Sequence, residues 1–211
     1  MNLYPELLII LLSYLIGSIS GGIIVSKIKK TDIRTMGSKS AGATNALRTM
    51  GTMIALIVVL IDVYKGYFAV YHIPSFFGID NNQIKLYSAL GAILGHCYPI
   101  FFKFKGGKGV GTALGTLIAM FPLSYSLIAF SIWLIMLILS GYVGLSSIIA
   151  GLSVPIIHNI FIQYNINDFY LQIFGILIGL FFVFTHRENI KRMINKEENQ
   201  FKKIMLFKSS K

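Results

Sequence analysis

The chain has 211 residues, of which 55% are hydrophobic and only 13% are charged, and its mean hydropathy is +0.72. A soluble domain of this size could not hide so much apolar surface from water, so the composition excludes an ordinary soluble globular protein. The net charge is +11, from 19 Lys and Arg against 8 Asp and Glu. We therefore expect an all-α integral membrane protein with a strongly basic surface.

Seven apolar runs are candidates for membrane-spanning helices, which need roughly 20 mainly apolar residues. In chain order they cover residues 3–26, 53–71, 84–102, 110–121, 123–140, 145–164 and 169–185. The fourth run is too short to span in full, and Pro122 leaves only a tight turn before the fifth. We expect one domain, residues 1–211, folded as a seven-transmembrane-helix bundle. No cleavable signal peptide is expected, because no basic residue precedes the first run and no small-residue cleavage pattern follows it.

The distribution of basic residues predicts the orientation. Of the 19 Lys and Arg, 17 lie in three alternate connections, residues 27–48, 103–108 and 187–211. By the positive-inside bias these connections face the cytoplasm, which places the N-terminus outside and the C-terminus inside. The basic face should attract anionic lipid headgroups, and a nucleic-acid partner is not expected because the charges are spread over short connections.

A glycine-rich loop lies between the third and fourth runs. Its centre is Gly106-Gly107-Lys108-Gly109. Successive glycine N–H groups can turn inward around an anion, and the start of the next helix adds its positive dipole end, so the loop suits a phosphate. It is not a Walker A loop, because no Ser or Thr follows Lys108, and a nucleoside triphosphate with Mg²⁺ is not implied. The structural alternative is a tight turn with a lysine at the headgroups.

The first basic connection is rich in small hydrogen-bonding residues. The Ser and Thr hydroxyls of this segment, its glycine amides and the guanidinium group of Arg48 suit a phosphate or an oxyanion. In the structural alternative, Thr44 or Asn45 caps the next helix and Arg48 reaches the headgroups.

Several polar residues lie within or at the ends of the apolar runs. Asp62 and Lys65 are three apart, and we expect them to pair because charges at bilayer depth are costly; a charge relay in a transporter is the alternative. Pro99 is expected to end the third helix, which leaves His96 at membrane depth with a structural hydrogen bond favoured over ligand contact. The single Cys97 is expected to be an inert apolar filler.

The last basic connection begins where the seventh run turns polar. If the helix continues, His186 and Asn189 share one face and Arg187 and Lys191 share another. We expect the first face to look into the bundle and the second to meet headgroups or solvent.

The remaining ionisable groups give no sign of a cofactor. The four histidines are too scattered in the sequence to predict a metal site. Glu197 and Glu198 lie in the basic tail, where we expect solvated ion pairs worth less than about 1 kcal/mol each.

Together these motifs resemble the bacterial membrane acyltransferases that acylate glycerol 3-phosphate from acyl phosphate, the Y-type enzymes of phosphatidate synthesis. The resemblance covers nearly the whole chain. It rests on Gly37-Ser38, Gly42-Ala43-Thr44-Asn45, Arg48, Asp62-Val63, Lys65-Gly66, Gly95-His96, Pro99, Gly106-Gly107-Lys108-Gly109-Val110, His186-Arg187, Asn189-Ile190 and Arg192.

The resemblance implies a substrate pair and a set of site residues. The acyl donor is acyl phosphate, the acceptor is glycerol 3-phosphate, the product is a membrane lipid precursor, and no metal or other cofactor takes part. The enzyme would lie in the bacterial inner membrane with its active site facing the cytoplasm. The implied catalytic residues are Ser38, Arg48, His186 and Asn189, and the implied substrate-binding residues are Thr44, Asn45, Gly106, Gly107, Lys108, Gly109 and Ser147.

The chain departs from the family pattern at four places. It has Lys39-Ser40 where the family usually has Gly-Asn, Ser20 for Pro, Gly111 for Ala, and Gly141-Tyr142-Val143-Gly144 for Arg-Tyr-Val-Ser. An Asn and an Arg are thus missing near a phosphate site, where Lys39 is one candidate for the lost charge. The alternatives are a paralogue with another acceptor, a phosphate-ester transporter and a non-catalytic scaffold. A transporter is disfavoured because the two halves show no obvious repeat and the polar residues gather at one membrane face.

Overall fold

The computed structural model describes residues 4–162, 169–201 and 205, and within these ranges it contains helices and no strand. The all-α prediction is therefore confirmed. The chain forms two compact units, Met1–Met120 and Phe121–Lys211, and each is described by itself.

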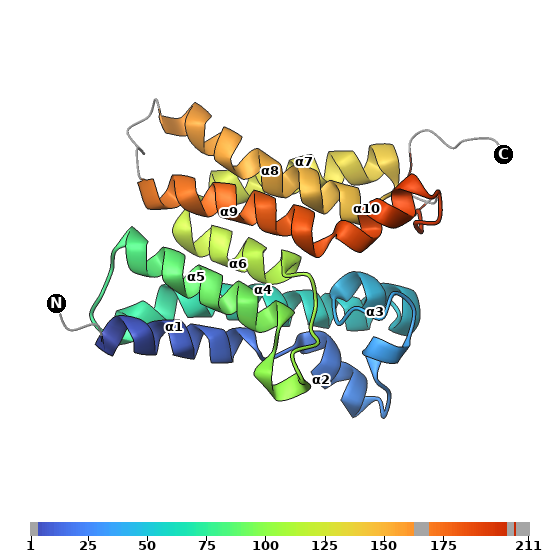
Figure 1. Ribbon diagram of the computed structural model, residues 1–211, viewed down its shortest axis with the longest axis horizontal. Coiled ribbons are helices and arrows are strands. Elements are labelled where there is room, and N and C mark those ends of the chain that lie inside the picture. Colours follow the sequence, from blue (N-terminus) through green and yellow to red (C-terminus); the bar gives the residue numbers. More distant parts are fainter. Residues whose placement is uncertain (1–3, 163–168, 202–204, 206–211) are drawn as a thin grey trace. The chain divides into compact units, whose positions relative to one another are not determined.

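The first unit contains six α-helices and two short 3₁₀ turns in its described part. They are α1 (Tyr4–Gly17), α2 (Gly21–Ile28), η1 (Ile33–Thr35), α3 (Ala43–Met50), α4 (Thr52–Phe76), α5 (Asn82–Cys97), η2 (Ile100–Phe102) and α6 (Val110–Met120). The long helix α4 packs against α1, α3, α5 and α6, and α1 also packs along α5 (Figure 1). As predicted, the third apolar helix ends just before Pro99.

Glycines let the helices of this unit approach backbone to backbone. A Cβ added at Gly66 of α4 would lie 2.2 Å from the carbonyl oxygen of Thr112, and one at Gly115 of α6 would lie 1.9 Å from the carbonyl oxygen of Val63. Close packing through small residues is how helices associate in a membrane, where lipid removes the hydrophobic drive between them. The α4–α6 pair therefore holds the start of α6, and the glycine loop before it, firmly against α4.

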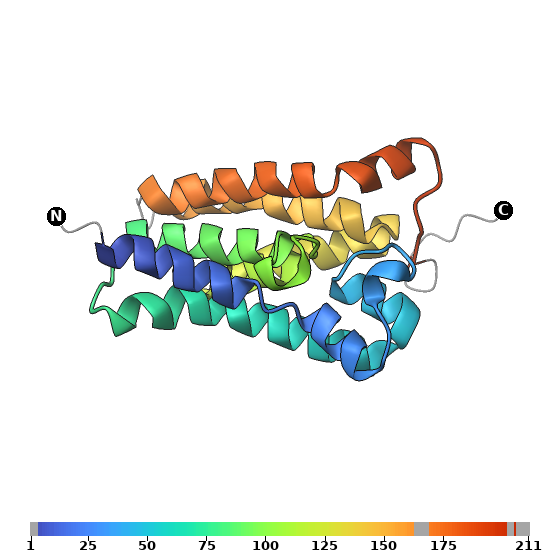
Figure 2. The same ribbon diagram turned by 60° about the horizontal axis from the view of Figure 1, so that its bottom comes forward.

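The first apolar run is two helices and not one. The chain leaves the helical path at residues 18–20, between α1 and α2 (Figure 2). Ser20, which stands where the family pattern has Pro, accepts a hydrogen bond from the Ile23 N–H at 3.4 Å and so caps α2.

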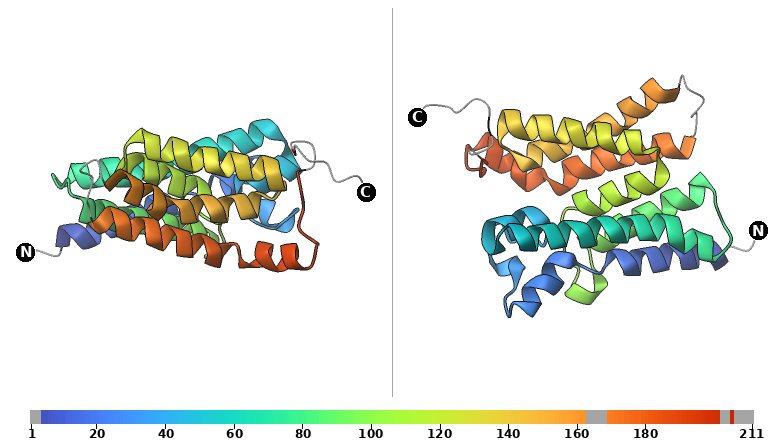
Figure 3. Two further views of the ribbon diagram at one scale, coloured as in Figure 1. Left: turned by 90° about the horizontal axis from the view of Figure 1, so that it is seen from above. Right: turned by 180° about the vertical axis from the view of Figure 1, so that it is seen from behind.

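The second unit contains four helices in its described part: α7 (Leu123–Ser140), α8 (Val143–Ile162), α9 (Phe169–Thr185) and α10 (Arg187–Ile194). Helix α8 packs against both α7 and α9 (Figure 3). The chain bends by 53° between α9 and α10. The condition that one helix continues through His186 and Asn189 is not met, because His186 lies at this bend and Asn189 lies in the separate helix α10.

Four segments in the described part of the chain are long and apolar enough to cross a membrane: Tyr4–Ile28, Thr52–Phe76, Leu123–Ser140 and Val143–Ile160. The bent pair of α9 and α10 would make a fifth. Helices α5 and α6, with 16 and 11 residues, are shorter than a full span. The seven spans and the orientation of the termini stay predictions.

Candidate active site

The first polar loop is organised around the buried side chain of Asn45 in α3. Its Nδ2 lies 3.0 Å from the carbonyl oxygen of Ile33, 2.9 Å from that of Met36 and 2.9 Å from that of Ser40. Its Oδ1 accepts a hydrogen bond from the Ser38 N–H at 2.9 Å. The Asn45 carboxamide therefore fixes the backbone of this loop through its hydrogen bonds.

The helix cap that was the structural alternative for this segment is not formed. Helix α3 starts at Ala43 after Gly42, with no side-chain capping bond, so neither Thr44 nor Asn45 caps it. Thr44 is half-buried in the first turn, and Arg48 is half-buried in the last turn. Ser38 is exposed, so its hydroxyl is accessible while its backbone is held by Asn45.

Two contacts join this loop to the glycine loop. The Ala41 N–H donates to the carbonyl oxygen of Gly106 at 3.4 Å. Arg34 donates from Nη1 to the carbonyl oxygen of Phe102 at 3.0 Å while its Nε and Nη2 pair with Asp32. The hydrogen bonds from Arg34 hold the pKa of Asp32 well below its usual range, at about 2. The first unit thus holds Ser38 on the first polar loop, Thr44, Asn45 and Arg48 in the helix α3 that follows it, and Gly106–Gly109 on the glycine loop connected to the first loop.

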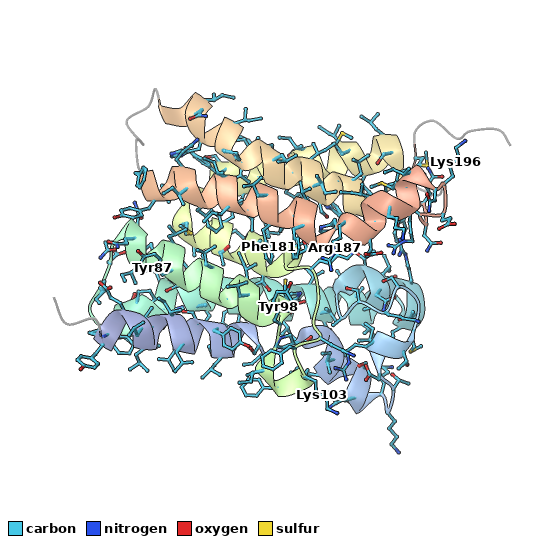
Figure 4. All side chains as sticks on the ribbon, viewed as in Figure 1. Tyr87, Tyr98, Lys103, Phe181, Arg187 and Lys196 are labelled. Carbon is cyan, nitrogen blue, oxygen red and sulfur yellow. The ribbon has the colours of Figure 1, made fainter. Side chains whose placement is uncertain are left out.

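The glycine loop uses its first two N–H groups differently from the predicted anion nest. Gly106 N–H donates to the carbonyl oxygen of Cys97 at 3.1 Å, and Gly107 N–H donates to that of His96 at 3.2 Å. The expectation that these two amides turn inward around an anion is therefore wrong. Gly109, with a φ of +85°, turns the chain into α6, and its carbonyl oxygen accepts the Ala113 N–H at 2.7 Å. In Figure 4, Lys103 marks the turn that leads from η2 into this loop.

Asp62 and Lys65 form the predicted ion pair. The Lys65 Nζ lies 2.9 Å from Asp62 Oδ1, and both side chains are buried. The same Nζ lies 2.9 Å from His96 Nδ1 and donates to the carbonyl oxygen of Ile19 at 2.8 Å. The structural hydrogen bond favoured for His96 is confirmed, and Cys97 is buried as expected.

The second unit holds His186 and Asn189, both of them buried. His186 Nδ1 lies 2.9 Å from the carbonyl oxygen of Phe182 and 3.3 Å from the Thr185 hydroxyl. Because the carbonyl can only accept, Nδ1 carries the proton in the neutral ring and Nε2 keeps the lone pair. Arg187, labelled in Figure 4, is exposed, as is Lys191, which agrees with their expected outward face.

A buried carboxylate in this unit escaped the sequence reasoning. Glu198 accepts a hydrogen bond from Asn189 Nδ2 at 3.1 Å and one from Arg192 Nε at 2.6 Å. The expected solvated ion pair is therefore wrong for Glu198, while Glu197 is exposed. Nothing in the local pattern separates the two adjacent glutamates, so only the fold could identify the one that orients Asn189.

Helix α8 carries the remaining predicted residue and borders an apolar groove. Ser147 is buried, accepts a hydrogen bond from Trp133 Nε1 at 3.1 Å and donates to the carbonyl oxygen of Val143 at 2.9 Å. The groove, of about 470 Å³, lies between α8 and α10. It is lined by Tyr142, Leu145, Ile148, Ile190, Met193 and Ile194.

Two positions of the family-pattern departure also have structural roles in this unit. Gly141 has a φ of +70° and ends α7, a conformation that favours glycine. A Cβ added at Gly144 would lie 2.9 Å from the Cβ of Asn189. The small residue at 144 therefore lets α8 approach Asn189 more closely than a serine would.

Sequence and structure comparisons agree on one family. A family model described as glycerol-3-phosphate acyltransferase matches residues 7–196. The glycerol-3-phosphate acyltransferase of Bacillus subtilis (strain 168) is 41% identical over 196 residues, covering 92% of this chain and 97% of its own. That of Aquifex aeolicus (strain VF5) is 38% identical over 196 residues, covering 92% and 98%.

A solved structure shares the fold over the same extent. The crystal structure of PlsY (YgiH), an integral membrane glycerol 3-phosphate acyltransferase in its glycerol 3-phosphate form, superposes with a TM-score of 0.83 at 36% identity. The match covers 93% of this chain and 95% of the other, and the lysophosphatidic acid form gives a TM-score of 0.81. This protein is a membrane acyltransferase, and the chain belongs to the glycerol-3-phosphate acyltransferase family.

Proposed function

We propose that this protein transfers a fatty acyl group from acyl phosphate to the sn-1 hydroxyl of glycerol 3-phosphate, giving lysophosphatidate and phosphate. This reaction is the first acylation step of phospholipid synthesis. The observation that carries the proposal is the connection of two polar loops, through Ala41 with Gly106 and Arg34 with Phe102, in a chain that matches a glycerol 3-phosphate-bound relative along nearly its whole length.

Phosphate binding is assigned to the glycine loop and the start of α6. Because the Gly106 and Gly107 amides are engaged by α5, the binding groups proposed are the Lys108 ammonium and the N–H groups of the first turn of α6. Arg48 supplies a second cation from the last turn of α3. Two cations suit a reaction that must hold two phosphate groups at once.

The chemistry needs no covalent intermediate, since acyl phosphate is already an activated donor. The enzyme must bring the acceptor hydroxyl to the acyl carbonyl and stabilise the oxyanion that develops there. We assign Ser38 and Arg48 as hydrogen-bond donors to the oxyanion and the phosphates. We place His186 and Asn189 in the catalytic centre. The lone pair on His186 Nε2 makes this atom a candidate base for the hydroxyl proton, with the phosphate of the donor as the alternative.

The membrane arrangement is part of the proposal. The three basic connections support a cytoplasmic active site in a bacterial inner membrane, with the N-terminus outside and seven spans. The acyl chain would then enter from the inner leaflet. Accessibility of single cysteines at residues 103 and 85 to a membrane-impermeant reagent tests this, because the proposal puts them on opposite sides.

The reaction is tested with purified protein, acyl phosphate and glycerol 3-phosphate, with lysophosphatidate as the readout. Turnover should occur with acyl phosphate, fail with acyl-CoA or acyl carrier protein, and survive a chelator. Comparable turnover with acyl-CoA would refute the proposed donor. Uptake of labelled glycerol 3-phosphate into vesicles without acyl donor would instead favour a transporter.

Lys108→Ala tests the phosphate site, with Lys105→Ala as the matched control. Lys105 is an exposed lysine three residues earlier in the same loop. A charge-assisted phosphate contact is worth roughly 1.5–3 kcal/mol, so the KM for glycerol 3-phosphate should rise about tenfold to a hundredfold for Lys108→Ala alone. Equal KM values for both variants and the wild type would assign Lys108 to another role.

A further inference from the structure

Three buried ionisable side chains lie beside the glycine loop and have no part in the chemistry proposed above. Asp62, Lys65 and His96 are 3%, 4% and 2% exposed. Lys65 Nζ forms an ion pair with Asp62 Oδ1 and makes two hydrogen-bond contacts, with His96 Nδ1 and with the carbonyl oxygen of Ile19. The lysine is thus the centre of a cluster that joins α4, α5 and the break between α1 and α2.

The contact with Lys65 determines the tautomer of His96. Because an ammonium group can only donate, Nδ1 is the acceptor and the proton of the neutral ring is on Nε2. Asp62 Oδ1 lies farther from Nδ1, at 3.5 Å, than the Lys65 Nζ does, at 2.9 Å. The ring is therefore held from one side by Lys65, and its Nε2 edge is turned to the glycine loop.

The glycine loop rests directly on this ring. A Cβ added at Gly107 would lie 2.2 Å from His96 Nε2, and one at Gly106 would lie 2.0 Å from the carbonyl oxygen of His96. The N–H groups of the same two glycines are bonded to the carbonyl oxygens of His96 and Cys97. The His96 ring and the backbone carbonyl oxygens at the end of α5 therefore together fix the position of the loop.

The start of α6 rests on the same cluster. A Cβ added at Gly111 would lie 3.1 Å from the Cβ of Asp62, so the first turn of α6 passes close to the base of the Asp62 side chain. Lys108 lies between Gly107 and this turn. The residue before Lys108 and the helical turn after it thus both pack against the cluster.

We propose that His96, held by Lys65 and Asp62, is a positioning residue. Its ring fixes the position of the glycine loop relative to the end of α5, and so places Lys108 and the first turn of α6 for the substrate phosphate. The inference rests on the proposed function, since it takes this loop as the phosphate site. It predicts that loss of either contact of the ring, the bond to Lys65 or the contact with Gly107, weakens phosphate binding more than it lowers the turnover rate of the bound complex.

Two substitutions separate these two sides. His96→Phe keeps an aromatic ring under Gly107 and removes the acceptor for Lys65, whereas His96→Asn keeps an acceptor near the position of Nδ1 and removes the ring. Ser88→Ala is the matched control, because Ser88 is buried in the same helix two turns earlier. We expect each His96 variant to raise the KM for glycerol 3-phosphate about tenfold or more with a smaller change in kcat, and the control to stay within about twofold.

A double-mutant cycle tests whether the ion pair acts through the ring. Replacing the pair together, Asp62→Asn with Lys65→Met, avoids leaving one buried charge alone. If the pair acts through His96, this change raises the KM, and adding His96→Phe raises it little further. Unchanged KM values in folded His96 variants, or increases that multiply in the triple variant, would overturn the proposal.

Direct binding separates this inference from the proposed reaction. The shift in thermal unfolding temperature caused by glycerol 3-phosphate, and by inorganic phosphate, is measured for the wild type and each variant. Wild-type binding without turnover from acyl phosphate would refute the donor and leave the His96 comparison intact, since loss of the shift in the His96 variants alone would still support it. A wild type that binds neither ligand would overturn both proposals.

Discussion

Glu198 offers the sharpest test of how the second unit holds Asn189. Glu198→Ala removes the acceptor of Asn189 Nδ2 and the partner of Arg192 Nε. A hydrogen bond to a buried charged group contributes about 1.5–3 kcal/mol. The Arg192 side chain is 33% exposed, so water can replace the carboxylate there and that contact should contribute at most about 1 kcal/mol.

The two contacts together predict a loss of roughly 2–4 kcal/mol in the free energy of unfolding, by the same contributions for a charged hydrogen bond and an exposed ion pair. For a chain of this size that is a fall of roughly 5–15 °C in Tm. Thermal unfolding in detergent measures it, with Glu197→Ala as the control because the adjacent glutamate is exposed. Glu198→Gln keeps an acceptor for Asn189 and should recover part of the loss. Equal Tm values for the two alanine variants would refute the assignment of Glu198 as a structural partner of Asn189.

Three further predictions concern the first unit. Asn45→Asp places an acceptor against the carbonyl oxygens of Ile33, Met36 and Ser40, so it should lower Tm and raise the KM for glycerol 3-phosphate, whereas Thr44→Ser should change neither by more than about twofold or a few degrees. Gly115→Ala should prevent close packing of α4 and α6 and lower Tm strongly, compared with Gly42→Ala, where a Cβ meets nothing nearer than 3.7 Å. The lowered pKa of Asp32 contributes stability that is present above its unfolded value of 3.8 and is lost as pH falls toward about 2, so Asp32→Asn should remove that part of the acid sensitivity in a Tm series.

Most helices could be predicted from the apolar runs, because strong end signals accompany them. The helices at 123–140 and 169–185 have the predicted bounds, the first of them enclosed by Pro122 and Gly141. The break at residues 18–20 could not be predicted, because the carbonyl oxygen of Ile19 in this break accepts its hydrogen bond from Lys65, 46 positions away. Local periodicity carries no information about such a distant donor.

The site was predictable in its residue types and much less in its hydrogen bonds. The glycine loop was expected to face an anion with its amides, and the family resemblance implied a substrate-binding role for Asn45. In the structure the Asn45 carboxamide and the Gly106 and Gly107 N–H groups bond to the protein itself. Which partner an amide takes depends on which loops meet in space, and adjacent positions such as Glu197 and Glu198 show the same dependence.

The cost of the Asp62–Lys65–His96 cluster argues for a role beyond stability. Taking a carboxylate and an ammonium group out of water costs several kcal/mol per ion, and well-packed apolar residues often do as well or better in the same space. Helix α4 already packs on α6 through glycines, and α5 packs on α1 through glycines, so stability alone does not require buried charges here. One ion pair and two hydrogen-bond contacts fix the orientation of the Lys65 ammonium group, and through Nδ1 that group fixes the orientation of the His96 ring as well. A site that must hold Lys108 at a set distance from a phosphate gains from that uniqueness, and an apolar core that can repack does not supply it.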